Sequence, residues 1–417
     1  METVILFGDP RMIEPIMADT TNSTIESDSP TRAELVARAT ALVPLLREDA
    51  AEADQERRLT QRVVDAITEA GLLQLMTPRR LGGLETDLST VLEVVGELGR
   101  GDMSTAWVAG VLNFTAWQVG TLGKQAQDDV WASNPRARIC SVLAPTAEYE
   151  RADGGIVVTG RWPVASGSQI SEWAFLSVPM SFGPQGPELS AALIPMSELT
   201  VLDTWNPAGV RGSASNTIVG KEIFVPEHRL MPIRPALNGE RPESHSGEPL
   251  YISSFAGIAS IATLAPQLGL GSAVFEAVTD QSQGRPVPTA GLMDQSESSA
   301  FQMRIADAGV RIDTAWLLAR QVAAEVDAAA ATGGLPDDGS RGRARMYSCW
   351  AAELVHDAVE TLISESGASA LMDGSPLQRM WRDNSTAARH TAYRIDPVRE
   401  LYGRILLDKG PGNALLF

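Results

Sequence analysis

His390 is a candidate proton-transfer residue, because the chain has only four histidines and imidazole is the side chain that titrates near neutral pH. It ends the segment WRDNSTAARH, eight residues after Arg382. With a pKa near 6.5, it can donate or accept a proton at neutral pH. The alternative is a helix-end histidine that the helix dipole favours. The others are weaker candidates, since His228 lies in a turn, His245 in a polar loop and His356 on a long helical pattern.

Serine hydroxyls form a second group of candidates. Ser166 and Ser168 lie in GRWPVASG, at the end of a β-branched segment, and a polar segment further on, GVRGSASNT, carries Arg211 and Ser213. Hydroxyls and guanidinium groups at such places can line a ligand pocket, but they can equally well hydrogen-bond the backbone of their own turn. The residues alone leave both interpretations open.

Several common chemistries find no motif in this chain. It contains no phosphate-binding P-loop, no HExxH or CxxC metal or redox motif, and no Gly-x-Ser-x-Gly elbow after a strand. Gly269 and Gly271 resemble half of a dinucleotide fingerprint, but no strand precedes them and a third glycine is missing. Close helix packing accounts better for this pair.

Composition narrows the class of protein and its partners. Of 417 residues, 44% are hydrophobic and 21% charged, which is close to the average for globular proteins, and no apolar run approaches a membrane span. The formal charge of −18 argues against nucleic acid or an anionic membrane as a partner. Cys140 and Cys349 lie far apart among apolar residues. We expect two buried free thiols and a cytoplasmic protein.

The hydrophobic period divides the chain into a helical, a β and a second helical part. Helical spacing predicts an N-terminal helical domain over residues 30–135, and short β-branched segments between Gly, Pro and Asp clusters predict an antiparallel β unit over 136–232. A polar loop follows at 233–250, and long helical patterns over 251–417 are typical of a bundle. Residues 1–29 lack the basic start and apolar core of a signal peptide and are expected to be a flexible leader.

Six segments in a fixed order carry a resemblance to a known family. They are LTQRVVDAITEAGLLQLMTPRRLGGLETD, STAWVAGV, ICSVLAP, DGGIVVTGRWPVASG, GVRGSASNTIVGKEIFVPEHR and PLQRMWRDNSTAARH. Together they resemble the acyl-CoA-dehydrogenase-like (group D) flavin monooxygenases, the oxygenase components of two-component aromatic hydroxylases. The resemblance runs from about residue 30 to the C-terminus. It implies an α+β fold with a helical N-terminal domain, a middle antiparallel β-barrel and a C-terminal four-helix bundle.

The resemblance also implies a chemistry for the candidate residues. Such enzymes take reduced flavin, FMN or FAD, from a separate NAD(P)H:flavin reductase, add O2 to form a C4a-hydroperoxide, and transfer one oxygen atom. Ser166 matches the serine that contacts the flavin, with Ser168 as the fallback, and a hydroxyl that accepts a hydrogen bond from flavin N5–H would slow loss of hydrogen peroxide. His390 matches the catalytic histidine of the family.

The substrate pocket departs from the family pattern at two places. Some phenol-hydroxylating relatives carry a second histidine where this chain has Thr115, in NFTAW, and one carries a tryptophan where this chain has Val164. Threonine cannot take a phenol proton near neutral pH, and valine leaves more room beside the flavin. We therefore expect a bulky aromatic or polyketide-like substrate, with Trp107 and Asn113 in the same pocket.

Cofactor phosphate and assembly complete what the resemblance implies. Arg285 and Arg304 flank the region where related folds contact flavin phosphate, often across a subunit interface. Arginine binds phosphate through two donors at once, although surface arginines on a bundle are also ordinary. Bundles of this family are commonly homotetramers.

Three other functions compete with a hydroxylase. One is an N-oxygenase of amines or amino sugars on the same fold. Another is a true acyl-CoA dehydrogenase, which needs a carboxylate base such as Glu400, but APTAEYE lacks the dehydrogenase Thr-Glu-Pro-x-x-Gly-Ser pattern. The third is a non-catalytic flavin-binding protein, which substitutions at Ser166 and His390 would distinguish.

Overall fold

The N-terminal part of the chain is helical, as predicted, and several of its helices begin at a side-chain cap. Thr31 and Glu34 form a capping box at the start of the first helix, and Asp87 and Asp102 accept backbone N–H groups at the starts of the third and fourth. The helices are α1 (Arg32–Glu56), α2 (Gln61–Glu69), α3 (Leu88–Gly101), α4 (Met103–Gly120) and α5 (Lys124–Trp131). Helix α4 is buried along almost its whole length, so it forms the centre of this part.

The computed structural model describes residues 29–412 apart from 145, 181–187, 234–236, 238–247 and 289–290. From Thr31 onward the chain forms one compact unit. The predicted leader and most of the predicted 233–250 loop lie outside the described residues, and the predicted domain boundaries stay predictions.

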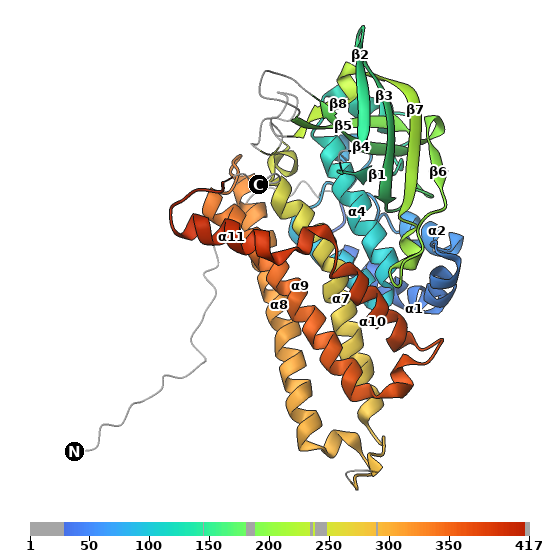
Figure 1. The fold of residues 1–417 in the computed structure, drawn as a ribbon, viewed down its shortest axis with the longest axis vertical. Coiled ribbons are helices and arrows are strands. Elements are labelled where there is room, and N and C mark those ends of the chain that lie inside the picture. The colour runs from blue at the N-terminus through green and yellow to red at the C-terminus, as the bar shows by residue number, and fades with distance from the viewer. Residues whose placement is uncertain are drawn as a thin grey trace, which may run out of the picture. The chain divides into compact units, whose positions relative to one another are not determined.

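The strands form two four-stranded sheets (Figure 1). One has the order β1-β4-β5-β8 and the other β2-β3-β7-β6. Their bounds are β1 (Ile139–Val142), β2 (Ala147–Ala152), β3 (Gly155–Ala165), β4 (Trp173–Met180), β5 (Glu188–Pro195), β6 (Thr200–Leu202), β7 (Asn216–Pro226) and β8 (Leu230–Pro232).

The sheets correct the prediction of a purely antiparallel unit. Strands β1 and β4 pair in parallel, with Ile139 opposite Trp173, whereas the other pairs are antiparallel. The chain leaves β1, forms β2 and β3 in the second sheet and then returns as β4, and a crossover of this length permits a parallel pair. Among the described residues the hydrogen-bond ladders give two separate sheets rather than one closed barrel.

The C-terminal part is built on three long helices, as predicted. These are α7 (Phe255–Ser282), α8 (Ser299–Ala331) and α9 (Asp338–Ser366), against which α10 (Pro376–Ala387) and α11 (Ile395–Leu406) pack (Figure 1). Helix α7 is the central one, since it contacts α3, α4, α8 and α9.

Helix α7 owes its apolar sequence to this central position. By length and composition it is the one described helix that could cross a membrane, but 83% of its most apolar window is buried inside the protein. A Cβ on Gly269 would lie 1.8 Å from the Gly96 carbonyl oxygen of α3. The glycine pair thus serves close helix packing, as predicted.

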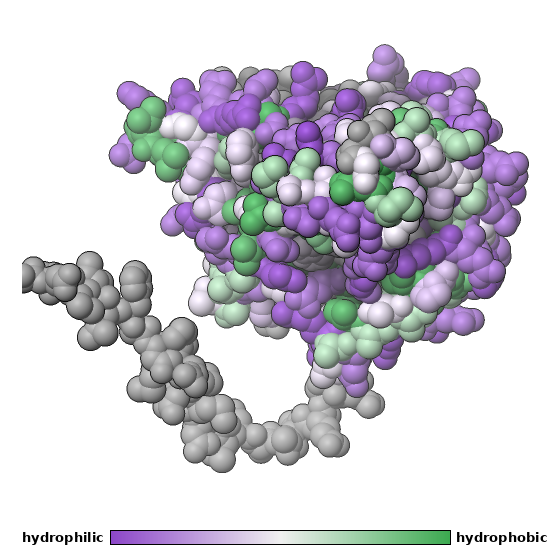
Figure 2. All heavy atoms as spheres, turned by 90° about the horizontal axis from the view of Figure 1, so that it is seen from below, coloured by the Kyte–Doolittle hydropathy of each residue, from purple (hydrophilic) through white to green (hydrophobic). Residues whose placement is uncertain are grey.

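The exposed end of the bundle, where α7 leads into α8, is mostly hydrophilic. Figure 2 shows this end, with hydrophobic residues only in small scattered groups. Cys140 and Cys349 are free and buried, as the sequence predicts.

Candidate active site

Ser166 lies directly after β3, at a break in the sheet register. The pairing of β3 with β7 shifts between Trp162 and Ala165, and Val164 takes the left-handed conformation with φ 63°. That conformation is strained for a β-branched residue and is often found at functional sites. The break leaves Val164 49% exposed and turns Ser166 inward.

The hydroxyl of Ser166 belongs to a chain of buried polar groups. Trp107 Nε1 of α4 donates to Ser166 Oγ at 3.1 Å, and Ser166 Oγ lies 2.7 Å from Ser215 Oγ. Ser215 Oγ lies 2.8 Å from Ser213 Oγ, which donates to the Val210 carbonyl at 2.8 Å. We call Ser166, Ser213 and Ser215 the serine chain.

The loop that carries Ser213 and Ser215 is strained and firmly held. Val210 and Ala214 both have positive φ, at 53° and 45°. Asp383 of α10 accepts the Val210 N–H at 2.6 Å, and Trp205 Nε1 donates to the Val210 carbonyl at 3.0 Å. These bonds hold Val210 in a conformation that its side chain disfavours.

Asp383 is a buried carboxyl group that our reading of the sequence did not identify. Burial, and next the nearby Asp102 carboxyl, raise the pKa of Asp383 to about 7. Asp102, the N-cap of α4, is itself buried, and its pKa is raised chiefly by that burial. The only available signal was the position of Asp383 in the segment already singled out for His390.

His390 follows the end of α10 and faces Trp107, with ring centroids 5.2 Å apart at 74°. The Ala392 N–H donates to His390 Nδ1 at 3.3 Å, so the neutral ring carries its hydrogen on Nε2. Nε2 has no hydrogen-bond partner among the described residues. The structure thus brings His390, Trp107 and Ser166 together from three distant segments.

The pKa of His390 differs from the sequence expectation. Burial, and then the Arg345 guanidinium, lower it from 6.5 to about 4. At neutral pH the ring is therefore neutral, and Nε2–H acts as a hydrogen-bond donor rather than as a group poised between two protonation states.

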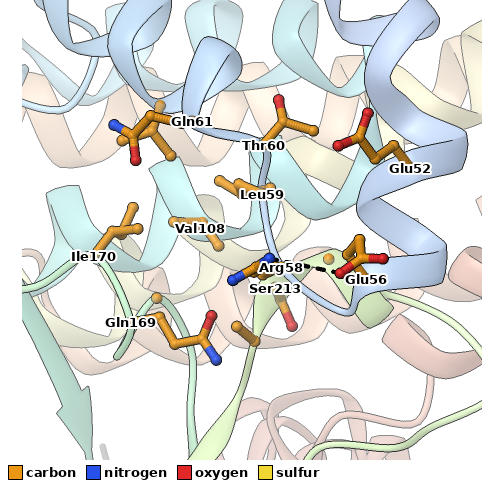
Figure 3. Close-up of a pocket in the computed structure, with 14 residues that line it drawn as sticks. Glu52, Glu56, Arg58, Leu59, Thr60, Gln61, Val108, Gln169, Ile170 and Ser213 are labelled. Carbon is orange, nitrogen blue, oxygen red and sulfur yellow. Dashed lines mark ion pairs between the residues drawn. The ribbon is translucent and has the colours of Figure 1, made fainter.

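A pocket of about 410 Å³ borders the serine chain (Figure 3). This volume is within the range of small-molecule sites. Its walls come from the α1–α2 region, from α4 and from the segments on either side of the serine chain. The lining residues are Glu52, Glu56, Arg58, Leu59, Thr60, Gln61, Val64, Val108, Gly167, Gln169, Ile170, Gly212, Ser213 and Ala214.

Comparison with known proteins assigns the family. Family models for the N-terminal and C-terminal domains of acyl-CoA dehydrogenase match residues 36–134 and 261–395. The oxygenase subunit HsaA, a flavin-dependent monooxygenase of Rhodococcus jostii, is 32% identical over 88% of this chain and 96% of its own length. The chain belongs to the acyl-CoA dehydrogenase-like flavin-dependent monooxygenases.

Two further relatives of this monooxygenase family support the assignment. The solved structure of XiaF from a Streptomyces species, in complex with FADH2 and glycerol, superposes with a TM-score of 0.85 and 31% identity, covering 92% of this chain and 97% of its own. The oxygenase component of an FADH2-dependent resorcinol hydroxylase from a Rhizobium species is 29% identical over 90% of this chain and 95% of its own length.

Two other residues predicted for the monooxygenase site, Ser168 and Arg211, form hydrogen bonds to backbone carbonyl groups of the protein. Ser168 Oγ donates to the Ala214 carbonyl at 3.2 Å. Arg211 donates to the carbonyl groups of Asp54 and Pro207, at 2.9 and 3.0 Å. These contacts favour the structural alternative that the sequence left open for both residues.

Asn113 and Thr115 of α4 are also engaged with the protein. The Asn113 amide donates to the Leu72 and Ala109 carbonyls and accepts the Met76 N–H. Thr115 Oγ1 lies 2.9 Å from the Val111 carbonyl and 2.8 Å from Ser141 Oγ. Both residues are fully buried, and these contacts leave Asn113 little capacity to bind a substrate.

The structure does not bring Arg285 and Arg304 to the serine chain. They lie near the turn between α7 and α8, at the lower end of the bundle in Figure 1, whereas the strands lie at the upper end. Arg285 donates to the Ser366 carbonyl, and Arg304 pairs with Glu365 at 2.8 Å. Glu400, the carboxylate considered for a dehydrogenase, is exposed on α11.

Proposed function

We propose that this chain is the oxygenase component of a two-component monooxygenase that hydroxylates a bulky aromatic or polyketide-like substrate. A separate NAD(P)H:flavin reductase supplies the reduced flavin, and O2 is the oxidant. The observation that carries the proposal is the meeting of Ser166, Trp107 and His390 in a chain that belongs to a family of oxygenase components. We further propose a cytoplasmic location, which two free cysteines support.

Reduced FAD is the first cofactor to test and FMN the second. The relatives that support FAD are the FADH2-dependent resorcinol hydroxylase and XiaF, whose structure contains FADH2. The residues fit this group, because the hydroxyl of Ser166 can accept a hydrogen bond from flavin N5–H. The pocket of about 410 Å³ is lined by Gly167 and Ser213, the chain neighbour of Ser166 and a member of the serine chain. When bound, reduced flavin supplies the two electrons that send one oxygen atom of O2 to the substrate and the other to water.

The protein side chains have distinct tasks in this reaction. Ser166 holds the proton at flavin N5, because a hydrogen bond to an N–H group opposes its loss. His390 Nε2–H donates a hydrogen bond to an oxygen atom of the reactants. Trp107, which is buried between them, orients Ser166 and excludes water.

Two residues support a bulky substrate. Val164 is small and 49% exposed, at the position where the resemblance places a large aromatic residue in one relative. Thr115 is buried against Ser141 and provides no base for a simple phenol.

The test is a single-turnover reaction with reduced flavin. The protein is mixed anaerobically with FADH2 or FMNH2, then with isotopically labelled O2 and monocyclic phenols, fused-ring phenols or amines, and the products are analysed by mass spectrometry. We expect one labelled oxygen atom in a fused-ring product. Labelled oxygen only in amines would favour an N-oxygenase, and no incorporation in any substrate would contradict the monooxygenase.

A homotetramer is the proposed assembly. Met303, Val310 and Leu317 are spaced seven residues apart along α8, and each is more than 60% exposed. Residues at this spacing lie on one side of a helix. Such an apolar stripe supports contact with another copy of the chain.

A further inference from the structure

We propose that Ser213 and Ser215 fix the Ser166 hydroxyl as an acceptor and thereby make the site select reduced over oxidised flavin. The inference rests on the proposed function, because it concerns the flavin that the oxygenase would bind. It assigns a positioning role to two serines that do not themselves need to touch the cofactor.

The direction of the serine chain follows from its last member. The Val210 carbonyl can only accept, so the single hydroxyl hydrogen of Ser213 is used in that bond. Ser215 must then donate to Ser213, because Ser213 has no hydrogen left. By the same count Ser166 must donate to Ser215.

The other end of the chain agrees with this direction. The indole N–H of Trp107 can only donate, and it donates to Ser166 Oγ. Ser166 therefore has its hydrogen committed to Ser215 and one lone pair committed to Trp107. What remains for a ligand is a second lone pair, which can accept a hydrogen bond but cannot give one.

The two redox states of flavin differ in the matching group. Reduced flavin carries a hydrogen on N5 and donates, whereas N5 of oxidised flavin has a bare lone pair and accepts. Ser166 Oγ, which can only accept, can bind the N5–H group of reduced flavin. Against oxidised flavin, the lone pair of Ser166 Oγ would face the lone pair of N5, with no hydrogen between them. A polar group left without its partner in a buried site typically costs enough to change an affinity about tenfold.

The anchor of the chain is rigid enough for this task. Val210 is held through its N–H by Asp383, and its carbonyl also accepts from Trp205. Ser213, Ser215 and Ser166 are each at most 5% exposed, so bulk water has little access to reverse the chain.

The experiment compares the affinities of oxidised and reduced FAD. Both are measured by anaerobic calorimetry on the wild type and on Ser213→Ala and Ser215→Ala, which leave Ser166 in place but free its hydrogen. We expect the ratio of the dissociation constants, oxidised to reduced, to fall about tenfold in both variants. The midpoint potential of bound FAD should fall by about 30 mV, the value of tenfold for a two-electron couple.

Ser168→Ala is the matched control, because this serine is buried in the same segment but donates to the Ala214 carbonyl outside the chain. Ser168→Ala should leave the ratio of the two dissociation constants unchanged. Ser213→Thr, which keeps a hydroxyl, should show the wild-type ratio. If Ser213 and Ser215 had a merely structural role, their replacement would weaken the binding of oxidised and of reduced FAD alike. A wild-type ratio in both alanine variants overturns this inference alone, while failure of the wild type to bind either flavin overturns the proposed function and the inference with it.

Discussion

The efficiency of the reaction should depend on one side-chain atom, the hydroxyl oxygen of Ser166. Its buried lone pair is the acceptor we assign to flavin N5–H. In Ser166→Ala that acceptor is lost, and the N5 proton leaves more easily. We expect the fraction of consumed O2 that appears as hydrogen peroxide, rather than as hydroxylated product, to rise about tenfold.

Peroxide and product are quantified together after a single turnover. Ser168→Ala again serves as the control, since its hydroxyl bonds only the Ala214 carbonyl. Equal peroxide yields from wild type and Ser166→Ala would argue against the assigned role.

His390 should set the acid limit of activity lower than an ordinary histidine does. Burial holds its pKa at about 4, so the ring stays neutral, with Nε2–H available, down to about pH 5. We expect the rate of product formation to show no inflection near pH 6.5, and His390→Ala to lower the rate by roughly 10²-fold or more. Stopped-flow measurements across pH 4.5 to 8 check this, and an inflection near 6.5 that vanishes in His390→Ala would disprove the neutral-ring assignment.

Helix α10 and the loop that carries Val210 form the element-scale support of the site. Arg382 of α10 makes a paired contact with both Asp54 carboxylate oxygens at 3.1 and 2.9 Å, and the next residue, Asp383, accepts the Val210 N–H. One short helix thus joins α1, the strained loop and His390. Displacement of α10 would disturb the serine chain and the histidine together.

Asp383 should make stability depend on pH in a direction unusual for an aspartate. Its folded-state pKa, about 7, lies above the ordinary 3.8, so the native state binds more protons than the unfolded state between these values. Its contribution to the free energy of unfolding is present below about pH 4 and is lost as pH rises through 7. In Asp383→Asn, which keeps an acceptor for Val210 N–H, this loss should disappear.

Melting temperatures of wild type and Asp383→Asn from pH 4 to 8 measure the effect. His390, whose pKa is lowered, contributes in the opposite sense between about pH 4 and 6.5, but it is common to both proteins and cancels in their difference. Asp383→Ala lacks the acceptor and should be destabilised by about 1–3 kcal/mol. A pH-independent difference between wild type and Asp383→Asn would contradict the raised pKa.

The elements were easier to predict from the sequence than the contacts between them. Helical spacing identified α7, α8 and α9, and two quoted segments contained Ser166 and His390, because these signals are local. Asp383 lies in one of those segments, yet its burial depends on a loop more than 160 residues earlier in the chain. The parallel β1–β4 pair and the engagement of Arg211 with Asp54 are likewise long-range.

At the scale of the whole molecule, most buried hydrophobic residues belong to one continuous core, which includes residues from both helical parts and both sheets. The exposed stripe of Met303, Val310 and Leu317 on α8 is therefore notable, because it lies outside that core. Helix α8 already buries another side against α9 and α7. These three large apolar side chains, with Asp307 and Thr314 between them on the same face, support a contact with a second packing partner.

Replacing Leu317 by Glu should break the assembly if this stripe is an interface between copies. A carboxylate buried at a subunit contact would be left without a partner, which disfavours association by several kcal/mol. Leu317 is 65% exposed in the single chain, so the folded subunit should keep its melting temperature within a few degrees. Analytical ultracentrifugation should give a tetramer for the wild type and smaller species for Leu317→Glu. Glu325→Gln on the same helix removes an ion pair with Arg343 rather than an apolar contact and serves as the control. An unchanged sedimentation coefficient in Leu317→Glu would exclude the α8 stripe as the interface.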